Sequence, residues 1–230
     1  MGDDVVPAII PQSFEDLEEK VARVKDFVDR VQIDVFDGTL SPSKNWPYNN
    51  PDDAAFQKLK NGELALPFSD ELILEIDATL SKPEERIGDW IKAGAKAILV
   101  HIEKVNDMER IIKTCRGAHV SVGIALSPQT PNEDVYPWVG DIDSVQFMGN
   151  QKVGYHGVEL NSDVLEKIRA FKDEHPEIVL ALDIGVNLET APKLVEAGVT
   201  RLVSGSAIFN SEKPAEAIEQ LRAILNRTNV

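Results

Sequence analysis

Short apolar segments rich in Val, Ile and Leu alternate with amphipathic segments along the whole chain. Such alternation is typical of an α/β fold in which helices cover parallel strands. Eight strands separated by helices fit a (β/α)8 TIM barrel, which typically takes about 250 residues. We therefore predict one TIM-barrel domain over residues 1–230. The expected strands are 5–10, 30–36, 71–78, 95–103, 119–126, 144–148, 178–183 and 201–206.

Helix start and stop signals support this division. Ser13 is suited to cap a helix that continues to Phe27, and Gly94 and Gly198 follow apolar helical faces where a helix is expected to end. The main alternative is an open, doubly wound sheet. No G-x-G-x-x-G motif follows the first expected strand, so the dinucleotide-binding form of that fold is not indicated.

Charge and cysteine content narrow the class of partner. The chain has 24 Lys and Arg against 39 Asp and Glu, a formal net charge of −15. Such a chain repels nucleic acids and anionic membranes, although backbone amides can still hold a small phosphorylated metabolite. Cys115 is the single cysteine and the sequence lacks a membrane-spanning apolar run. We expect a cytoplasmic protein without nucleic-acid or membrane partners.

One expected strand carries polar side chains. Residues alternate faces along a strand, so Gln32, Asp34 and Phe36 share one face of the segment 30–36. Strands of a parallel barrel are covered on both sides, and an isolated buried carboxylate is costly. Gln32 and Asp34 are therefore expected to be paired, hydrated or bound to a ligand.

Two further aspartates end expected strands. Asp77 ends the third strand, with Glu75 two residues before it, and Asp183 ends the seventh. Each taken alone could be a cap or turn residue. In a barrel, however, Asp34, Asp77 and Asp183 would face the same mouth, where clustered carboxylates repel unless a cation or a shared proton lies among them.

The histidines are weaker candidates. His101 and Glu103 share a face at the end of the fourth expected strand, where they could contact substrate or be packed structurally. His156 follows the sixth strand on the same side. His119 and His175 precede strands and are predicted to be surface residues at the opposite end.

Glycines follow the last three expected strands. Gly185 lies two residues after Asp183, the eighth strand ends in Ser204-Gly205-Ser206, and residues 149–157 end at Gly157. Barrels commonly bind phosphate on backbone amides of such loops. We predict that Gly157, Gly185, Gly205 and Ser206 bind an anionic group. The long segment 38–50 is either a lid over the mouth or a solvated loop.

Eight segments, in chain order, resemble the strand-end motifs of the ribulose-phosphate 3-epimerase family. The resemblance spans nearly the whole chain, and IDVFDG, ALSPQTP, LDIGVN and SGSAIF are its most specific parts. The segments are VPAIIPQSFEDL, VQIDVFDG, LEIDATLSKPEE, AILVHIE, VGIALSPQTP, VQFMGNQKVGYHG, LALDIGVN and LVSGSAIF.

The resemblance implies a barrel enzyme that interconverts ribulose 5-phosphate and xylulose 5-phosphate. Asp34 and Asp183 match the two aspartates that act as acid and base in the family, and Met148 matches a methionine that shields the site from water. Gln32 and Asp77 stand where the family has metal-binding histidines. At these two positions the sequence departs from the family pattern, so it resembles a divergent member.

The histidine replacements change the expected metal. Gln32, Asp34, Asp77 and Asp183 would offer oxygen donors alone, which suit Mg²⁺, Mn²⁺ or Ca²⁺ better than Zn²⁺. We predict an oxygen-liganded divalent cation.

Two other functions stay open. The barrel could be a catalytically silent or re-purposed binder of a sugar phosphate, which the histidine losses favour. A decarboxylase or aldolase of the same barrel group ranks lower, because Lys82 is misplaced for the Asp-x-Lys-x-x-Asp motif of those enzymes. The resemblance also suggests a homo-oligomer, with Trp46, Trp90 and Trp138 as contact, core or lid residues.

Overall fold

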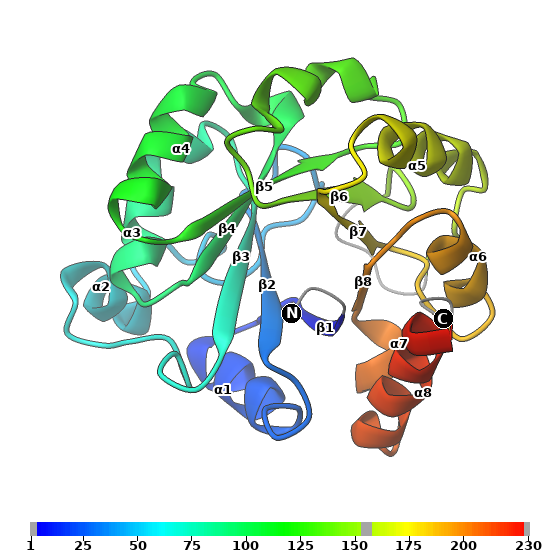
Figure 1. The fold of residues 1–230 in the computed structure, drawn as a ribbon. Helices are drawn as coiled ribbons and strands as arrows, with labels where there is room; N and C mark the ends of the chain where they lie inside the picture. Colours follow the sequence, from blue (N-terminus) through cyan, green and yellow to red (C-terminus); the bar gives the residue numbers. More distant parts are fainter. Residues whose placement is uncertain (1–3, 153–157, 228–230) are drawn as a thin grey trace. The chain divides into compact units, whose positions relative to one another are not determined.

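The structure, a computed structural model, describes residues 4–152 and 158–227 (Figure 1). The order of the strands is that of a closed barrel from β1 to β8. This confirms the predicted (β/α)8 TIM-barrel fold class. The strands are β1 Asp4–Ile9, β2 Arg30–Phe36, β3 Ile73–Thr79, β4 Ala97–His101, β5 Ser121–Leu126, β6 Ser144–Met148, β7 Val179–Asp183 and β8 Arg201–Ser204.

Helices separate the strands along the chain. The α-helices are α1 Phe14–Ala22, α2 Ala54–Asn61, α3 Ile87–Lys92, α4 Met108–Gly117, α5 Asp163–Glu174, α6 Ala191–Glu196, α7 Ser206–Phe209 and α8 Pro214–Arg227. Short 3-10 helices are η1 Pro83–Glu85, η2 Ile102–Lys104, η3 Asn132–Asp134 and η4 Tyr136–Trp138.

The chain divides into two compact units. One comprises Ala8–Gly123 and is called here the β2–β4 unit; the other comprises Met1–Pro7 and Ile124–Val230 and is called the β6–β8 unit. The expectation that residues 1–230 form one domain stays a prediction.

In the β2–β4 unit, β2 pairs with β3 along its whole length, from Arg30↔Ile73 to Phe36↔Thr79. β4 continues this parallel sheet. Helix α3 packs between α2 and α4 on one side of these strands (Figure 1). All side chains of β2 and β3 except those of Arg30 and Ile73 are buried, as expected for a parallel sheet covered on both faces.

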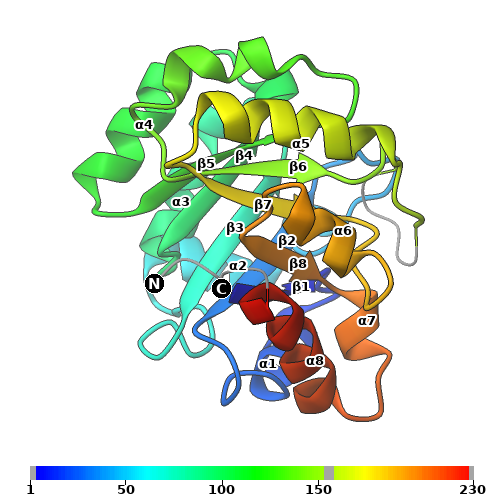
Figure 2. The same cartoon turned by 45° about the vertical axis from the view of Figure 1, so that its right-hand side comes forward.

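In the β6–β8 unit, β6 pairs with β7 from Ser144↔Val179 to Met148↔Asp183. β8 joins β7, and the first four residues of β1 pair with β8. Helix α5 lies against β6, and α8 packs against α6 and α7 (Figure 2).

The helix boundaries confirm most of the expected signals. The Ser13 side chain accepts a hydrogen bond from the Asp16 amide and caps α1. Gly94 and Gly198 follow α3 and α6 in the left-handed conformation. The expected extension of α1 to Phe27 is wrong, because the chain after Ala22 forms tight turns such as Phe27 N to Val24 O, and Phe27 itself is exposed.

Two strands, β4 and β8, end two residues earlier than predicted. β4 ends at His101, so Glu103 lies in the turn η2 rather than on the strand. β8 ends at Ser204, since Gly205 caps the short helix α7 and Ser206 begins it. In both places the sequence continues with apolar residues, and the apolar pattern alone does not mark where the backbone turns.

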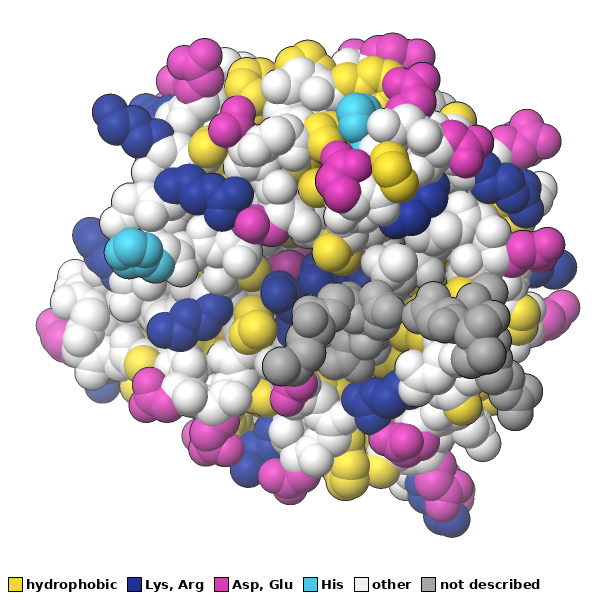
Figure 3. All heavy atoms as spheres, viewed as in Figure 1, with side chains coloured by type: hydrophobic (Ala, Val, Ile, Leu, Met, Phe, Trp, Pro, Cys, Tyr) yellow, Lys and Arg dark blue, Asp and Glu magenta, His cyan; other side chains and the backbone are white. Residues whose placement is uncertain are grey.

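Acidic side chains are distributed around the face seen in Figure 3, in agreement with the net charge. Within residues 4–152 and 158–227, no helix is both long and apolar enough to span a bilayer.

Candidate active site

The polar face of β2 is a hydrogen-bonded pair. Gln32 Nε2 donates to Asp34 Oδ1 at 2.8 Å, and both residues are buried. Of the three expected states, paired, hydrated or ligand-bound, the structure shows pairing for these two side chains. The other amide atom, Gln32 Oε1, is buried and has no hydrogen-bond partner among the described residues. Buried polar atoms are rarely left in this state, so a ligand, ion or water is expected at Gln32 Oε1.

Asn45 fixes the backbone on either side of this pair. Its Nδ2 donates to the Asp34 carbonyl at 2.7 Å, and its Oδ1 accepts from the Phe36 amide at 2.7 Å. Sequence reasoning missed Asn45, because only the folded segment 38–50 brings it onto β2. Trp46 and Pro47, which follow, are buried. Part of the segment is therefore packed into the unit and is not solvated along its whole length, and its role as a lid over the mouth stays a prediction.

A second cluster joins β3 and β4. Asp77 Oδ1 lies 3.1 Å from His101 Nε2 and 3.3 Å from Thr79 Oγ1, and Thr79 Oγ1 lies 3.1 Å from the same His101 nitrogen. All three residues are almost fully buried. Asp77 is the register partner of Asp34 on β2, so these two predicted site residues are neighbours across the sheet. Thr79 also belongs to this cluster, although the sequence analysis did not identify it as a candidate.

Two nearby acidic residues have different roles. Glu75 is buried and forms an ion pair with Arg30, with Oε2 2.7 Å from Nη1. That pairing accounts for Glu75 as a structural residue. Glu103 Oε2 lies 3.9 Å from His101 Nδ1, on the far side of the ring from Asp77. The expectation that the two residues share a face of the fourth strand is wrong, because Glu103 approaches the His101 ring from the turn η2. His101 itself is packed and hydrogen-bonded, which was one of its two expected roles.

In the β6–β8 unit, Asp183 ends β7 and is held by backbone. Its Oδ1 accepts from the Ile184 amide at 2.7 Å, and its carbonyl accepts from the Gly149 amide at 2.6 Å. Ile184 and Gly185 both have left-handed backbones, with φ of 71° and 85°. A β-branched residue in this region is unusual, so the turn after Asp183 is held against its local preference.

The predicted phosphate-binding residues of this unit lie at two turns. Gly185 is packed against the Leu160 backbone so closely that a Cβ would lie 2.8 Å from the Leu160 nitrogen. Gly205 caps α7 and Ser206 is its first residue. The first backbone amides of a helix lack an acceptor carbonyl within that helix. Ser204 Oγ donates to the Val186 carbonyl at 3.3 Å and links the two turns. Gly157 and His156 lie outside the described residues.

Met148 is buried beside Asp183 in the β6–β7 register. Its Sδ is 4.0 Å from Gln146 Nε2, a second buried amide that sequence reasoning did not consider. His119 is exposed, as predicted. The prediction for His175 is wrong: its ring packs against Tyr136 and Phe171, with centroids 4.9 and 5.1 Å away.

The expected metal donors can be compared with this geometry. Among the residues that the structure describes, no group of three or more His, Cys, Asp or Glu side chains could hold a metal ion. Three of the predicted donors, Asp34, Asp77 and Asp183, are described and do not form such a group. Gln32 Oε1 is a buried oxygen without a partner in the described part of the chain, and amide oxygens are donors that hard divalent cations accept. The oxygen-liganded cation stays a prediction.

Comparison with protein families decides the assignment. The model of the ribulose-phosphate 3 epimerase family matches residues 4–209, which include every strand of the barrel. The chain belongs to the ribulose-phosphate 3-epimerase family. This confirms the resemblance seen in the sequence and places the protein in a family of isomerases.

Individual relatives support the same family. The chain is 30% identical to ribulose-phosphate 3-epimerase of Bacillus subtilis over 95% of this chain and 97% of that protein. It is 31% identical to the chloroplastic ribulose-5-phosphate-3-epimerase of Arabidopsis thaliana, covering 95% of this chain and 76% of that protein.

Solved structures extend the likeness in fold. A 3-keto-L-gulonate-6-phosphate decarboxylase from Vibrio cholerae matches with a TM-score of 0.73 at 14% identity, covering 99% of each chain. A 3-hexulose-6-phosphate synthase matches with a TM-score of 0.69 at 19% identity, covering 96% of this chain and 99% of that one. At these identities the likeness concerns the barrel alone, and the ribulose-phosphate 3-epimerase family is the closer guide to chemistry.

Proposed function

We propose that this member of the family epimerises C3 of a ketopentose 5-phosphate, converting ribulose 5-phosphate and xylulose 5-phosphate into each other. The observation that carries the proposal is the buried Gln32–Asp34 pair, whose second amide atom has no partner. A carboxylate held in this way towards the carboxyl end of a barrel strand is oriented before a ligand binds.

The reaction needs two acid–base groups. The hydrogen at C3 is weakly acidic because it lies next to a ketone, so its removal requires a positioned base and stabilisation of the resulting enediolate. In the proposed mechanism Asp34 takes the C3 proton and Asp183 delivers a proton to the opposite face, with the roles exchanged in the reverse direction. The mechanism requires one carboxyl to be ionised while the other is protonated.

Gln32, Asp34, Asp77 and Asp183 are the proposed donors to a divalent cation. When bound, such a cation would neutralise negative charge that develops on substrate oxygens. The unpartnered Gln32 oxygen supports this role, and the Asn45 hydrogen bonds to the β2 backbone would keep Asp34 in place. Asp77 is already oriented by Thr79 and His101, so its position does not depend on the cation.

The substrate phosphate is proposed to bind at Gly157, Gly185, Gly205 and Ser206. The left-handed turn at Gly185 and the start of α7 support this assignment, because both turn backbone amides outward from secondary structure. Met148 is buried beside Asp183 and would help to exclude water from the enediolate.

Exchange of the C3 hydrogen with solvent tests the proposal. In deuterated water with Mg²⁺ or Mn²⁺, we expect the protein to incorporate deuterium at C3 of ribulose 5-phosphate, as measured by NMR or mass spectrometry. Asp34→Asn and Asp183→Asn should each lower the rate by about 1,000-fold or more, since each removes a proton-transfer group. Asp173→Asn, an exposed residue of α5, is the matched control and should exchange like the wild type. Wild-type protein that leaves C3 unlabelled with every divalent cation tried would refute the function.

A silent or re-purposed sugar-phosphate binder is the second candidate. The Asp77–His101 contact favours this candidate. In that contact His101 engages the carboxyl of Asp77, which stands where the family pattern has a metal-binding histidine. Thermal unfolding separates the two functions, since any ligand of the native state raises the midpoint. A raised midpoint with ribulose 5-phosphate but no exchange at C3 would select this alternative.

A further inference from the structure

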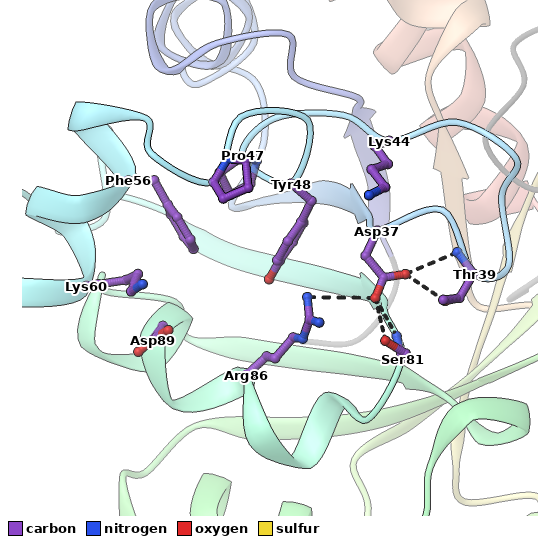
Figure 4. Close-up of a pocket in the computed structure, with 11 residues that line it drawn as sticks. Asp37, Thr39, Lys44, Pro47, Tyr48, Phe56, Lys60, Ser81, Arg86 and Asp89 are labelled. Carbon is purple, nitrogen blue, oxygen red and sulfur yellow. Dashed lines mark hydrogen bonds and ion pairs between the residues drawn. The ribbon is translucent and has the colours of Figure 1, made fainter.

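A pocket of about 520 Å³ lies in the β2–β4 unit, and its lining includes none of the residues assigned above to catalysis, metal or phosphate. We propose that it binds an organic phosphate that carries a flat apolar group, of the size and chemistry of a nucleoside monophosphate. The walls come from the segment after β2, from α2 and from the η1–α3 region (Figure 4). The volume lies within the range usual for small-molecule sites, about 300 to 1,000 Å³.

Three cationic side chains line this pocket: Lys44, Lys60 and Arg86. Arg86 Nη1 lies 3.7 Å from Asp37 Oδ2. Among the described residues, neither Lys44 nor Lys60 has a carboxylate within ion-pair distance. In a chain with 39 acidic and 24 basic residues, two such lysines in one concave site favour an anionic ligand.

Two carboxylates, Asp37 and Asp89, also line the pocket, so its three cationic and two acidic side chains leave a formal net charge of +1. The Asp37 carboxylate is held in place by four hydrogen bonds. Oδ1 accepts from the amide and hydroxyl of Thr39, and Oδ2 accepts from the amide and hydroxyl of Ser81. Burial alone would raise the pKa of Asp37, but these hydrogen bonds outweigh it and hold the pKa below its ordinary value. An antiparallel bridge between Asp37 and Lys44 fixes the backbone that carries the lysine.

Aromatic rings form the wall between the cations. Trp90 Nε1 donates to the Tyr48 hydroxyl at 3.1 Å, and the Arg86 guanidinium lies 5.3 Å from the centroid of the Tyr48 ring. Burial raises the pKa of Tyr48 to about 12, so this hydroxyl stays neutral at physiological pH. Lys60 Nζ lies 5.5 Å from the centroid of the Phe56 ring.

Figure 4 shows Phe56 and Tyr48 between Lys60 on one side and Lys44 on the other. Pro47 and Pro51 add further apolar surface. A flat apolar group lying on this wall would bring an attached phosphate to the lysine at one of its edges. A sugar phosphate has the phosphate but lacks the apolar group, so the pocket should discriminate against it.

Isothermal titration calorimetry with AMP tests the inference. We expect one AMP per chain, with adenosine and ribose 5-phosphate each binding at least about tenfold more weakly, because each lacks one half of the recognised chemistry. The double variant Lys44→Met/Lys60→Met should weaken AMP binding by about tenfold or more, since it removes the cation at either edge of the wall and with it the contact to the phosphate. Lys58→Met is the matched control, because Lys58 is an exposed residue of α2 that does not line the pocket.

Competition distinguishes this site from the proposed active site. Saturating ribulose 5-phosphate should leave the AMP affinity unchanged, and Asp34→Asn should do the same. The inference is overturned if wild-type protein gives no heat with millimolar AMP, if the double lysine variant binds as well as Lys58→Met, or if ribulose 5-phosphate displaces AMP. None of these outcomes depends on turnover, so failure of the proposed function would leave this result interpretable.

Discussion

The two units hold the aspartates of the proposed site by different means. In the β2–β4 unit, side chains orient other side chains: Gln32 donates to Asp34, and His101 contacts Asp77. In the β6–β8 unit, the carboxylate of Asp183 accepts from the next backbone amide, and the turn that supplies this amide is left-handed.

This difference shows where each aspartate's position is encoded. Asp34 and Asp77 depend on which side chains stand beside them, so their geometry changes when a partner is substituted. Asp183 depends on the path of the backbone, so residues without any polar side chain control its geometry. Substitutions of apolar or glycine residues that alter the backbone should therefore disturb Asp183. Substitutions of polar partners that leave the backbone in place should disturb Asp34 and Asp77.

Gly149→Ala should have the largest effect. A Cβ at this position would lie 2.0 Å from the Ile184 carbonyl oxygen and 3.0 Å from a Leu160 methyl carbon, so the backbone that carries Asp183 must shift. We expect a loss of about 3 kcal/mol or more in the free energy of unfolding. Denaturant titration measures it, with Gly140→Ala as the control, since a Cβ at Gly140 meets nothing within 4 Å. Equal stability of the two variants would contradict the backbone account of Asp183.

The Asp77–His101 contact should have the next largest effect. His101→Leu leaves the buried Asp77 carboxylate without its ring partner and should cost about 2 kcal/mol. Combining it with Asp77→Asn removes the unpaired charge, so the double variant should be more stable than the sum of the single effects by about 1 kcal/mol.

The double-mutant cycle is needed because His101 also approaches Glu103. Losses that do not involve Asp77 occur in both His101 variants and cancel in the cycle. Unfolding free energies of the four proteins, measured by urea titration at one pH, give the coupling. Strict additivity would show that Asp77 and His101 are neighbours without a stabilising interaction.

Local patterns predicted the framework and part of the site. The bounds of β2 and β6 follow from their apolar runs, and alternation along β2 places Gln32 beside Asp34. The cap at Ser13 is likewise local, since its partner is the Asp16 amide three residues on. Such features depend on residues that are close in sequence, so one amino-acid sequence is enough to predict them.

Features that need distant segments were missed. Asn45 reaches the β2 backbone only after the segment 38–50 has folded back, and Thr79 joins His101 across two strands. Nothing in the residue type of Ile184 indicates a left-handed backbone, because local preference opposes it. Asp34 and Asp183 are also far apart in the chain, so local patterns do not show whether they converge on one substrate. Their convergence stays a prediction.

Ile184 gives the smallest effect and the sharpest test of the backbone account. At a φ of 71° any side chain beyond glycine is strained by about 1 kcal/mol, so Ile184→Gly should be more stable than Ile184→Ala by about that amount. This reverses the usual order, in which alanine is the more stable by about 1 kcal/mol inside a helix. Ile112, a half-buried residue of α4, provides the control pair, with Ile112→Ala expected to be the more stable variant. Because both pairs remove the same side chain, opposite signs at the two positions can come only from backbone conformation. The same sign at both would mean that the turn after Asp183 relaxes once the isoleucine is gone, and the carboxylate would then depend on the Ile184 side chain after all.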